Sequence, residues 1–387
     1  MGRFNSECFY SIRLLSKMKS NQIYKDYEDE LHKLTDVLKV DDSMAESMFS
    51  KLLIILPNTG KLYKYKSLGS FHVDELKDKY VWFSSANNLN DNKDCTLNVN
   101  AEYETESLLR FFLKDNNFRK FLVKGFYMEL VHCHPYITPE EVEYWFQIIT
   151  QNGAKIGKLE FNLICKNYSL TDRQRQQFIN AINLYRDKNQ TEKQIRQCIS
   201  GLSDEIERIR NSIHVLSLTT SYKKDNMWAY YCNNEGICIE YDFNKINSIN
   251  LKKLFIYTHH VRYGKKKKFS FVKIVKANFS NDVNETVDAD KLINEQLLTK
   301  DKSWSTEDEW RVLIYDKSGI SENKHYVDMI SAIYLDQSIL NKKKTKSIIK
   351  LANKNGWKIY VRYFNRTEAE YVFKTLEEIN RTIEKRD

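Results

Sequence analysis

Proline is scarce in this chain, with 3 residues among 387, and the 7 cysteines include no C-x-x-C pair. Disulfide frameworks and structural zinc sites depend on regular cysteine spacings. The neighbours His132, Cys133 and His134 offer metal-ligand chemistry, but no second pair follows at ligand spacing. Because zinc normally takes four converging ligands, we expect neither a disulfide scaffold nor a bound metal.

Long apolar runs are absent as well, since no stretch approaches the roughly 20 residues that span a bilayer. The N-terminal segment has no apolar signal core, although Met18 offers an alternative start. We therefore expect a soluble, cytoplasmic protein without membrane contact. Walker, G-x-G-x-x-G, H-E-x-x-H and G-x-S-x-G motifs are also missing, which argues against the enzyme classes that they mark.

What the chain has in excess is positive charge, with a formal net charge of +9. An excess of this size permits nucleic acid or another polyanion as a partner without requiring one. The length of 387 residues is enough for two domains, or for one domain with a large insertion.

Hydrophobic periodicity divides the chain into four parts. Residues 1–57 form a helical lead-in, 58–100 carry the first strands of a core, 101–212 show helical spacing, and 213–387 return to strands. We expect about eight short strands interrupted by helices. The predicted fold is α+β, with a central, mostly antiparallel sheet and residues 101–212 as a helical insertion.

Three expectations for the second half of the core are specific. The pattern predicts a strand over 254–263, a helix over 336–353 that ends before Gly356, and a final helix over 367–385.

The stretch from Trp304 to Tyr315, WSTEDEWRVLIY, combines a strand pattern with a cluster of charge. Glu309 and Arg311 alternate with apolar residues, so they share one face of the predicted strand. Glu307 joins them if the strand begins early. The pair could act on a ligand, or it could be a surface ion pair on an edge strand, which is the more frequent meaning of an isolated E-x-R.

A second informative block runs from Lys61 to Cys95. It holds a basic and aromatic strand, a second strand and a polar loop, and its candidate binding residues are Lys64, Tyr65, Lys66, Ser84, Ser85, Asn90 and Asp91. A strand that runs into such a loop places many hydrogen-bonding groups at one sheet edge. Ordinary turn chemistry explains the same residues.

A third block runs from Asp225 to Phe243. Trp228 and Tyr231 could stack on a planar ring, or they could be core aromatic residues. Gly236 provides backbone freedom in the turn that follows, and Glu240 places a second carboxylate on the polar side of a strand.

The three blocks together resemble a widespread bacterial family that is catalogued as a domain of unknown function and often found near mobile elements and phage-defence genes. The residues that carry the resemblance are Y-K-Y from Tyr63, W-F-S-S from Trp82, M-W from Met227 with G-I-C-I-E from Gly236, and E-D-E-W-R from Glu307. Asn92 stands where the family usually has proline.

The order of these parts is also similar to that of ADP-ribosyltransferases of the toxin and defence type. That resemblance implies a role in NAD binding for Lys64 or Lys66, a pocket lined by Ser84 and Ser85, and stacking by Trp228 or Tyr231. It implies that Glu309 stabilises an oxocarbenium-like transition state, with Arg311 steadying Glu309 or binding pyrophosphate.

The leading hypothesis is therefore an NAD-consuming or ADP-ribosyl-transferring effector, with Glu309, Arg311 and Glu240 as candidate catalytic residues. Its target would be nucleic acid or a translation component, and a protein of the same defence operon is a further candidate partner. One alternative is a non-catalytic sensor that binds a nucleotide or nucleic acid. Another is a metal-dependent nuclease using Asp91, Asp94, Glu240 and Glu309.

Overall fold

A computed structural model of the chain contains two compact units. Unit 1 comprises Met1–Thr96, Ile209–Lys267 and Ile293–Asp387, and unit 2 comprises Leu97–Arg208 and Lys268–Leu292. The residues that the structure describes are 24–31, 40–89, 91, 94–96, 99–112, 123, 125–128, 130–131, 133–151, 158–186, 192–193, 196, 204, 208, 210–270, 272–273, 292–315 and 323–384.

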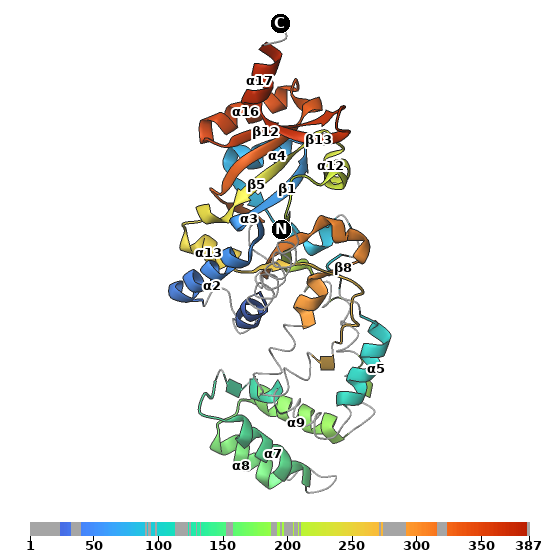
Figure 1. The fold of residues 1–387 in the computed structure, drawn as a ribbon. Helices are drawn as coiled ribbons and strands as arrows, with labels where there is room; N and C mark the ends of the chain where they lie inside the picture. The colour runs from blue at the N-terminus through green and yellow to red at the C-terminus, as the bar shows by residue number, and fades with distance from the viewer. Residues whose placement is uncertain are drawn as a thin grey trace, which may run out of the picture. The chain divides into compact units, whose positions relative to one another are not determined.

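Unit 1 is built on one large sheet (Figure 1), with the strand order β13-β12-β11-β5-β1-β4-β9-β6 and β3 added beside β4. Neighbouring strands are antiparallel except β11 and β12, which are parallel. This confirms the prediction of an α+β fold with a mostly antiparallel sheet. The strands are β1 (Lys61–Ser67), β3 (Ser84–Ser85), β4 (Ile213–Thr219), β5 (Gly236–Asp242), β6 (Thr258–His260), β9 (Glu309–Tyr315), β11 (Ile330–Asp336), β12 (Lys358–Asn365) and β13 (Glu370–Thr375).

The sheet is nearly interrupted in its middle. β1 pairs with β5 along its whole length, and β4 pairs with β9 along its whole length. Between β1 and β4, whose residues are all described, the register consists of the single pair Tyr63 and Thr219. The two halves of the sheet therefore separate beyond Tyr63.

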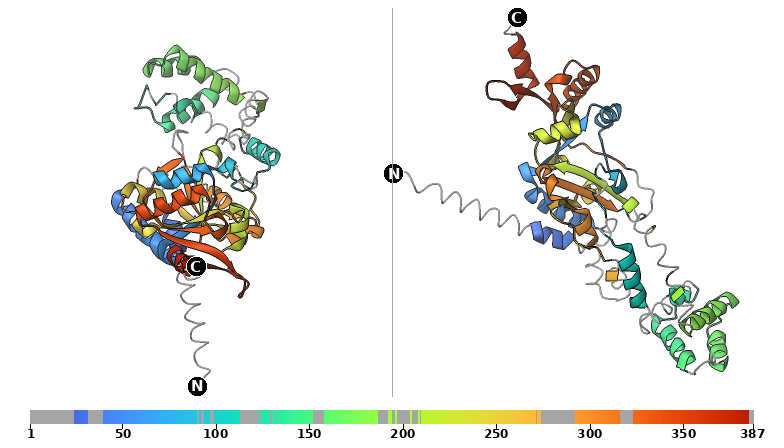
Figure 2. Two further views of the ribbon diagram at one scale, coloured as in Figure 1. Left: turned by 90° about the horizontal axis from the view of Figure 1, so that it is seen from above. Right: turned by 90° about the vertical axis from the view of Figure 1, so that its right-hand side faces the viewer.

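Helices cover both faces of the sheet (Figure 2). One face packs on α2 (Asp42–Ile55), α4 (Ser70–Asp78), α13 (Ile249–Phe255) and α16 (Lys343–Asn355), which form the main apolar core with the strands. The Asp41 side chain caps α2 by accepting a hydrogen bond from the Met44 amide at 2.8 Å. The other face packs on α12 (Asp225–Cys232) through the aromatic residues of β1 and β11.

Smaller elements complete unit 1. β2 (Tyr80–Trp82) pairs with β10 (Lys324–Tyr326), and β7 (Arg262–Tyr263) pairs with β8 (Thr299–Lys300). The remaining helical elements are α3 (Pro57–Gly60), α17 (Leu376–Glu384) and the short 3-10 helices η2 (Ala86–Asn88), η3 (Phe243–Lys245), η4 (Lys302–Glu307) and η5 (Gln337–Ile339).

Unit 2 is helical over its described residues. Its elements are α5 (Ala101–Phe112), α7 (Pro139–Gln151), α8 (Lys158–Asn167) and α9 (Asp172–Arg186). Their apolar faces meet around Phe178, whose ring stacks on Phe126 with centroids 4.6 Å apart and also contacts Phe146.

All three specific expectations for the second half of the core are wrong in part. The helix predicted over 336–353 begins only at Lys343, because Asp336 still belongs to β11. Residues 249–255 form the helix α13, so the predicted strand begins only at Thr258. The segment 370–375 is β13, which pairs with β12, and the final helix begins only at Leu376. Pairing with a neighbouring strand overrides the local helical pattern here. The prediction for Gly356 is confirmed, since it ends α16 with φ +68°.

Gly236 has a different role from the predicted one. The left-handed residues of this turn are Asn233 and Asn234, with φ of 48° and 55°. A Cβ at Gly236 would lie 2.3 Å from the carbonyl oxygen of Lys66 and 2.7 Å from Cβ of Cys232. Glycine is therefore required by the close approach of β5 to β1.

We predict that Gly236→Ala destabilises the protein by about 1–3 kcal/mol, because the added methyl must displace backbone. Urea denaturation would measure the loss. Gly264→Ala is the matched control, since a Cβ there meets no atom within 4 Å. Equal stability of the two variants would contradict the argument.

Candidate functional site

A cavity of about 390 Å³ lies in unit 1 where β1 and β4 separate. Volumes of this order are usual for small-molecule sites. Its walls come from segments that are far apart in the sequence: β1, α4, the residues after β2, β4, α12, η4 and the start of β9. The cavity thus occupies the position that a continuous ladder between β1 and β4 would fill.

The β1 wall carries two lysines in different states. Lys66 is buried and forms an ion pair with Glu75 of α4. Lys64 is half-buried and donates a hydrogen bond from Nζ to the carbonyl oxygen of Ser217 at 2.9 Å. Burial, aided by the charge of Lys66, lowers the pKa of Lys64 to about 8. Lys64 forms no ion pair with any described residue. Its positive charge is therefore less neutralised than that of Lys66, which pairs with Glu75.

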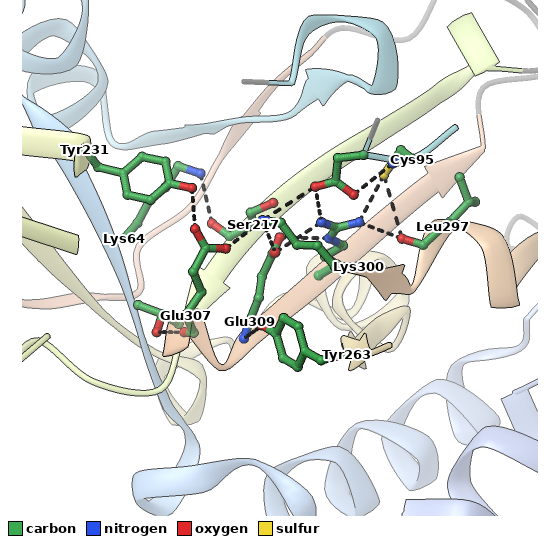
Figure 3. A network of polar contacts seen from close by, with 12 residues as sticks. Lys64, Cys95, Ser217, Tyr231, Tyr263, Leu297, Lys300, Glu307 and Glu309 are labelled. Carbon is green, nitrogen blue, oxygen red and sulfur yellow. Dashed lines mark hydrogen bonds and ion pairs between the residues drawn. The ribbon is translucent and has the colours of Figure 1, made fainter. Parts of the chain in front are cut away.

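The floor of the cavity is a buried network of charges (Figure 3). Arg311 donates from Nε to Glu309 Oε1 at 2.7 Å and from Nη2 to Asp94 Oδ2 at 2.5 Å. Lys300 Nζ lies 2.6 Å from Glu307 Oε2, 3.1 Å from Glu309 Oε2 and 3.6 Å from Asp94 Oδ2. The interpretation of Glu309 and Arg311 as a surface ion pair on an edge strand is therefore wrong. Both side chains are buried, and β9 lies between β4 and β6.

The backbone brings Glu307 and Glu309 to the same ammonium group. Glu307 ends η4, and Glu309 begins β9. Between them, Asp308 adopts a left-handed conformation with φ +45°, and its carboxylate accepts from His260 at 3.0 Å. The carboxylates of Glu307 and Glu309, on either side of this turn, both contact the ammonium group of Lys300.

The electrostatics of the floor follow from burial and pairing. Burial alone would raise the pKa of Glu309, but the charges of Arg311 and Lys300 outweigh it and lower this pKa to about 2. The surrounding carboxylates likewise raise the pKa of Lys300 against the effect of burial. Three carboxylates and two cations give the floor a formal charge of −1.

An aromatic wall borders this acidic floor. The Tyr231 hydroxyl donates to Glu307 Oε1 at 2.6 Å, and burial together with this carboxylate raises the pKa of Tyr231. The ammonium of Lys300 lies 4.9 Å from the ring centroid of Trp304. Tyr230 contacts the rings of both Tyr231 and Trp304, with centroids 5.1 and 5.4 Å away.

The structure brings together most of the residues that the sequence singles out. The following line the cavity: Lys64, Tyr65, Lys66, Ser84, Asp91, Tyr231 and Glu309. Arg311 lies directly behind Glu309 and is fully buried. Ser85 pairs with His214 of β4 instead, and its Oγ accepts from the Asn87 amide at 3.4 Å. Asn90 and Met18 lie outside the described residues.

Two other candidates lie elsewhere. Trp228 is fully buried against β1, and its indole donates to the Tyr222 carbonyl at 2.8 Å. It is therefore a core residue. Glu240 is bonded to Lys61, Ser331 and Tyr334 at 2.9, 2.6 and 2.7 Å. Glu240 lies on the same face of the sheet as Glu309. The strands that carry them, β5 and β9, are three strand spacings apart, which is roughly 14 Å.

The sequence analysis assigned no role to three residues of the site. Lys300, Glu75 and Ser217 line the cavity, and Ser217 also bonds Glu309. Ser217 shares its face of β4 with Val215 and Thr219, so alternation alone does not single it out. The contact between Asp94 and Arg311 joins segments 217 residues apart and has no local signal.

Comparison with known proteins gives one match. The model of a family described as "protein of unknown function (DUF2971)" matches residues 227–312, so the chain is similar to that family over this segment. The matched residues include most of α12, all of β5 and η4, and the start of β9. No curated protein and no solved structure matches the chain. No helix in the described part of the chain combines the length and apolar character needed to cross a membrane.

We predict that the network makes stability depend on pH in the acid range. Because the pKa of Glu309 falls from 4.5 to about 2 on folding, its contribution is present above pH 4.5 and is lost as the pH falls toward 2. The loss is about 3 kcal/mol. Urea denaturation at a series of pH values would measure it, and the slope should flatten in Glu309→Gln. Direct NMR titration of this carboxylate with a pKa near 4.5 would contradict the prediction.

Proposed function

We propose that unit 1 is an NAD-consuming or ADP-ribosyl-transferring enzyme and that its cavity binds the nicotinamide and ribose end of the dinucleotide. The observation that carries this proposal is the separation of charge across the cavity. The floor around Glu309 has a formal charge of −1, and Lys64 carries a positive charge on the β1 wall. NAD has the complementary arrangement, a cationic pyridinium ring joined through ribose to an anionic pyrophosphate.

The chemistry suits a single ionised carboxylate. When the bond between ribose C1′ and the nicotinamide nitrogen breaks, its electron pair stays on the nitrogen, and nicotinamide leaves neutral without needing a proton. The ribose becomes oxocarbenium-like, and a nearby carboxylate stabilises that charge. Glu309 is ionised at neutral pH because its pKa is about 2. Attack by an acceptor hydroxyl or water, with loss of its proton, completes the transfer.

The other walls fit the remaining parts of the ligand. Trp304 and Tyr231 offer aromatic surface beside the acidic floor, which favours a planar cation such as the pyridinium ring. Lys64 would hold a phosphate, because Lys66 is already neutralised by Glu75. Arg311 is a positioning residue that holds Glu309 through its Nε and Nη2 groups at 2.7 and 3.1 Å. The ADP-ribose acceptor would be nucleic acid or a translation component, and antiviral defence is the setting that the family resemblance implies.

The first test is nicotinamide release from NAD by the purified full chain. We predict that Glu309→Gln lowers the release rate by about 10²- to 10³-fold, because the amide cannot stabilise positive charge. Calorimetric titration with NAD should give a similar affinity for both proteins. Glu240→Gln is the matched control, since it changes a buried carboxylate outside the cavity. Equal release rates in wild type and Glu309→Gln would contradict the proposal.

The second test uses the pH dependence of binding. Because the pKa of Lys64 is about 8, its charge is present below pH 8 and lost above it. The affinity for NAD should therefore fall between pH 7 and 9.5 in the wild type. In Lys64→Met it should be lower by roughly 10- to 100-fold at pH 7 and nearly independent of pH. Lys61→Met, on the opposite face of the same strand, should keep the wild-type profile.

One observation favours a second candidate, a module that binds a nucleotide without turnover. Both carboxylate oxygens of Glu309 are already bonded, one to Arg311 and the other to Arg311 and Lys300. Binding of NAD without nicotinamide release would support this candidate. The nuclease hypothesis is weaker, because the Lys300 ammonium lies where Asp94, Glu307 and Glu309 converge. The described residues include no cluster of three His, Cys, Asp or Glu residues that could hold a metal.

A further inference from the structure

Two segments of the chain are strongly basic and contain no acidic residue. From Gln337 to Thr367 the sequence contains seven lysines, two arginines and no acidic residue. The formal charge of this segment is therefore +9, which equals the net charge of the whole chain. The second basic segment, from Phe243 to Asn281, contains nine lysines, one arginine and no acidic residue.

The structure places most of the lysines between Gln337 and Thr367 on one helix, α16 (Figure 1). Thr345, Ile348 and Ala352 are buried against the sheet. The opposite face carries four exposed lysines at intervals of three or four residues: Lys343, Lys346, Lys350 and Lys354. Residues at this spacing lie on one side of a helix. Lys342, Lys344 and Lys358 are exposed beside them.

The fold does not require this charge. Lys343 and Lys344 lie in the first turn of α16, where the helix dipole disfavours cations. Like charges at a spacing of four residues, as at Lys346 and Lys350, also destabilise a helix. Within the described part of the chain, Lys342 is the one member of the seven that forms an ion pair, with Glu235 at 2.5 Å. The remaining charge is available to a partner.

We propose that the exposed face of α16 binds the phosphate backbone of a nucleic-acid duplex without sequence specificity. α16 has 13 residues and is therefore about 20 Å long, a span over which duplex DNA carries on the order of 12 phosphate charges. Lysine serves as a point charge for phosphate, whereas base reading usually relies on arginine, asparagine and glutamine. The exposed positions of α16 carry five lysines, no arginine or glutamine, and a single asparagine, Asn353.

Other anionic partners fit this face less well. Protein interfaces are depleted in lysine and enriched in aromatic residues. A helix that lies on a membrane inserts large apolar side chains, whereas the exposed positions of α16 are Lys, Ser and Asn. The proposal rests on this surface alone and not on the chemistry of the cavity.

The experiment measures binding of the full chain to fluorescent 20-base-pair duplexes of DNA and of RNA by anisotropy, between 50 and 200 mM salt. The variant Lys343→Gln, Lys346→Gln, Lys350→Gln and Lys354→Gln keeps helix propensity, because lysine and glutamine differ little in it. We expect affinity at 50 mM salt to fall at least about tenfold and the slope of log affinity against log salt to become shallower by about 3 to 4.

The control changes four exposed lysines outside α16 to glutamine and so alters the net charge equally: Lys25, Lys265, Lys268 and Lys302. It should keep both affinity and salt slope within about twofold of the wild type. An equal loss in the control would show a general charge effect and overturn the proposal. So would failure of the wild type to bind either duplex, or binding confined to phosphatidylserine vesicles. Circular dichroism of each variant establishes that it is folded.

Discussion

The pairing between β1 and β4 is the constraint on which the candidate site depends. In this register the two strands overlap over five residue pairs, but they meet at Tyr63 and Thr219 alone. Two lysines of β1 make side-chain contacts where the ladder is missing. Lys64 reaches the Ser217 carbonyl with its ammonium group, and Lys66 pairs with Glu75. Each strand remains anchored by its other neighbour, so the sheet stays intact while a cavity opens inside it.

The charges at the floor of this cavity hold a geometry more than they stabilise the fold. A buried ion pair loses most of its Coulombic gain to desolvation, and an apolar replacement of equal volume is often as stable. Here the cations Lys300 and Arg311 contact three carboxylates, so the network has one more negative than positive group. Such an arrangement fixes Glu309 and keeps it ionised at the edge of a cavity. Perturbed carboxylates of this kind occur frequently at functional sites.

The sequence predicted the parts of the site that local pattern controls. Alternation in β9 placed Glu309 and Arg311 on one face, and the register with β4 shows that they share it with Ser217. Burial was not predictable, because it depends on Asp94 and Leu297 from distant segments that cover Arg311. The same limit applied to Trp228, which could have been a stacking platform or a core residue until its burial decided the question. β13 was missed because its strand conformation comes from pairing with β12.

A net charge is often taken as a property of a whole protein, but in this chain basic residues are gathered in particular stretches. Gln337 to Thr367 has a formal charge of +9, while the residues around the cavity mix acids with bases. A moderate overall value therefore concealed a dense local one, and only the burial of α16 on one side showed that its lysines share a surface. Charge distributed evenly would promote solubility alone. Charge gathered on one rigid helix face creates a local potential, which is the physical requirement for capturing a polyanion.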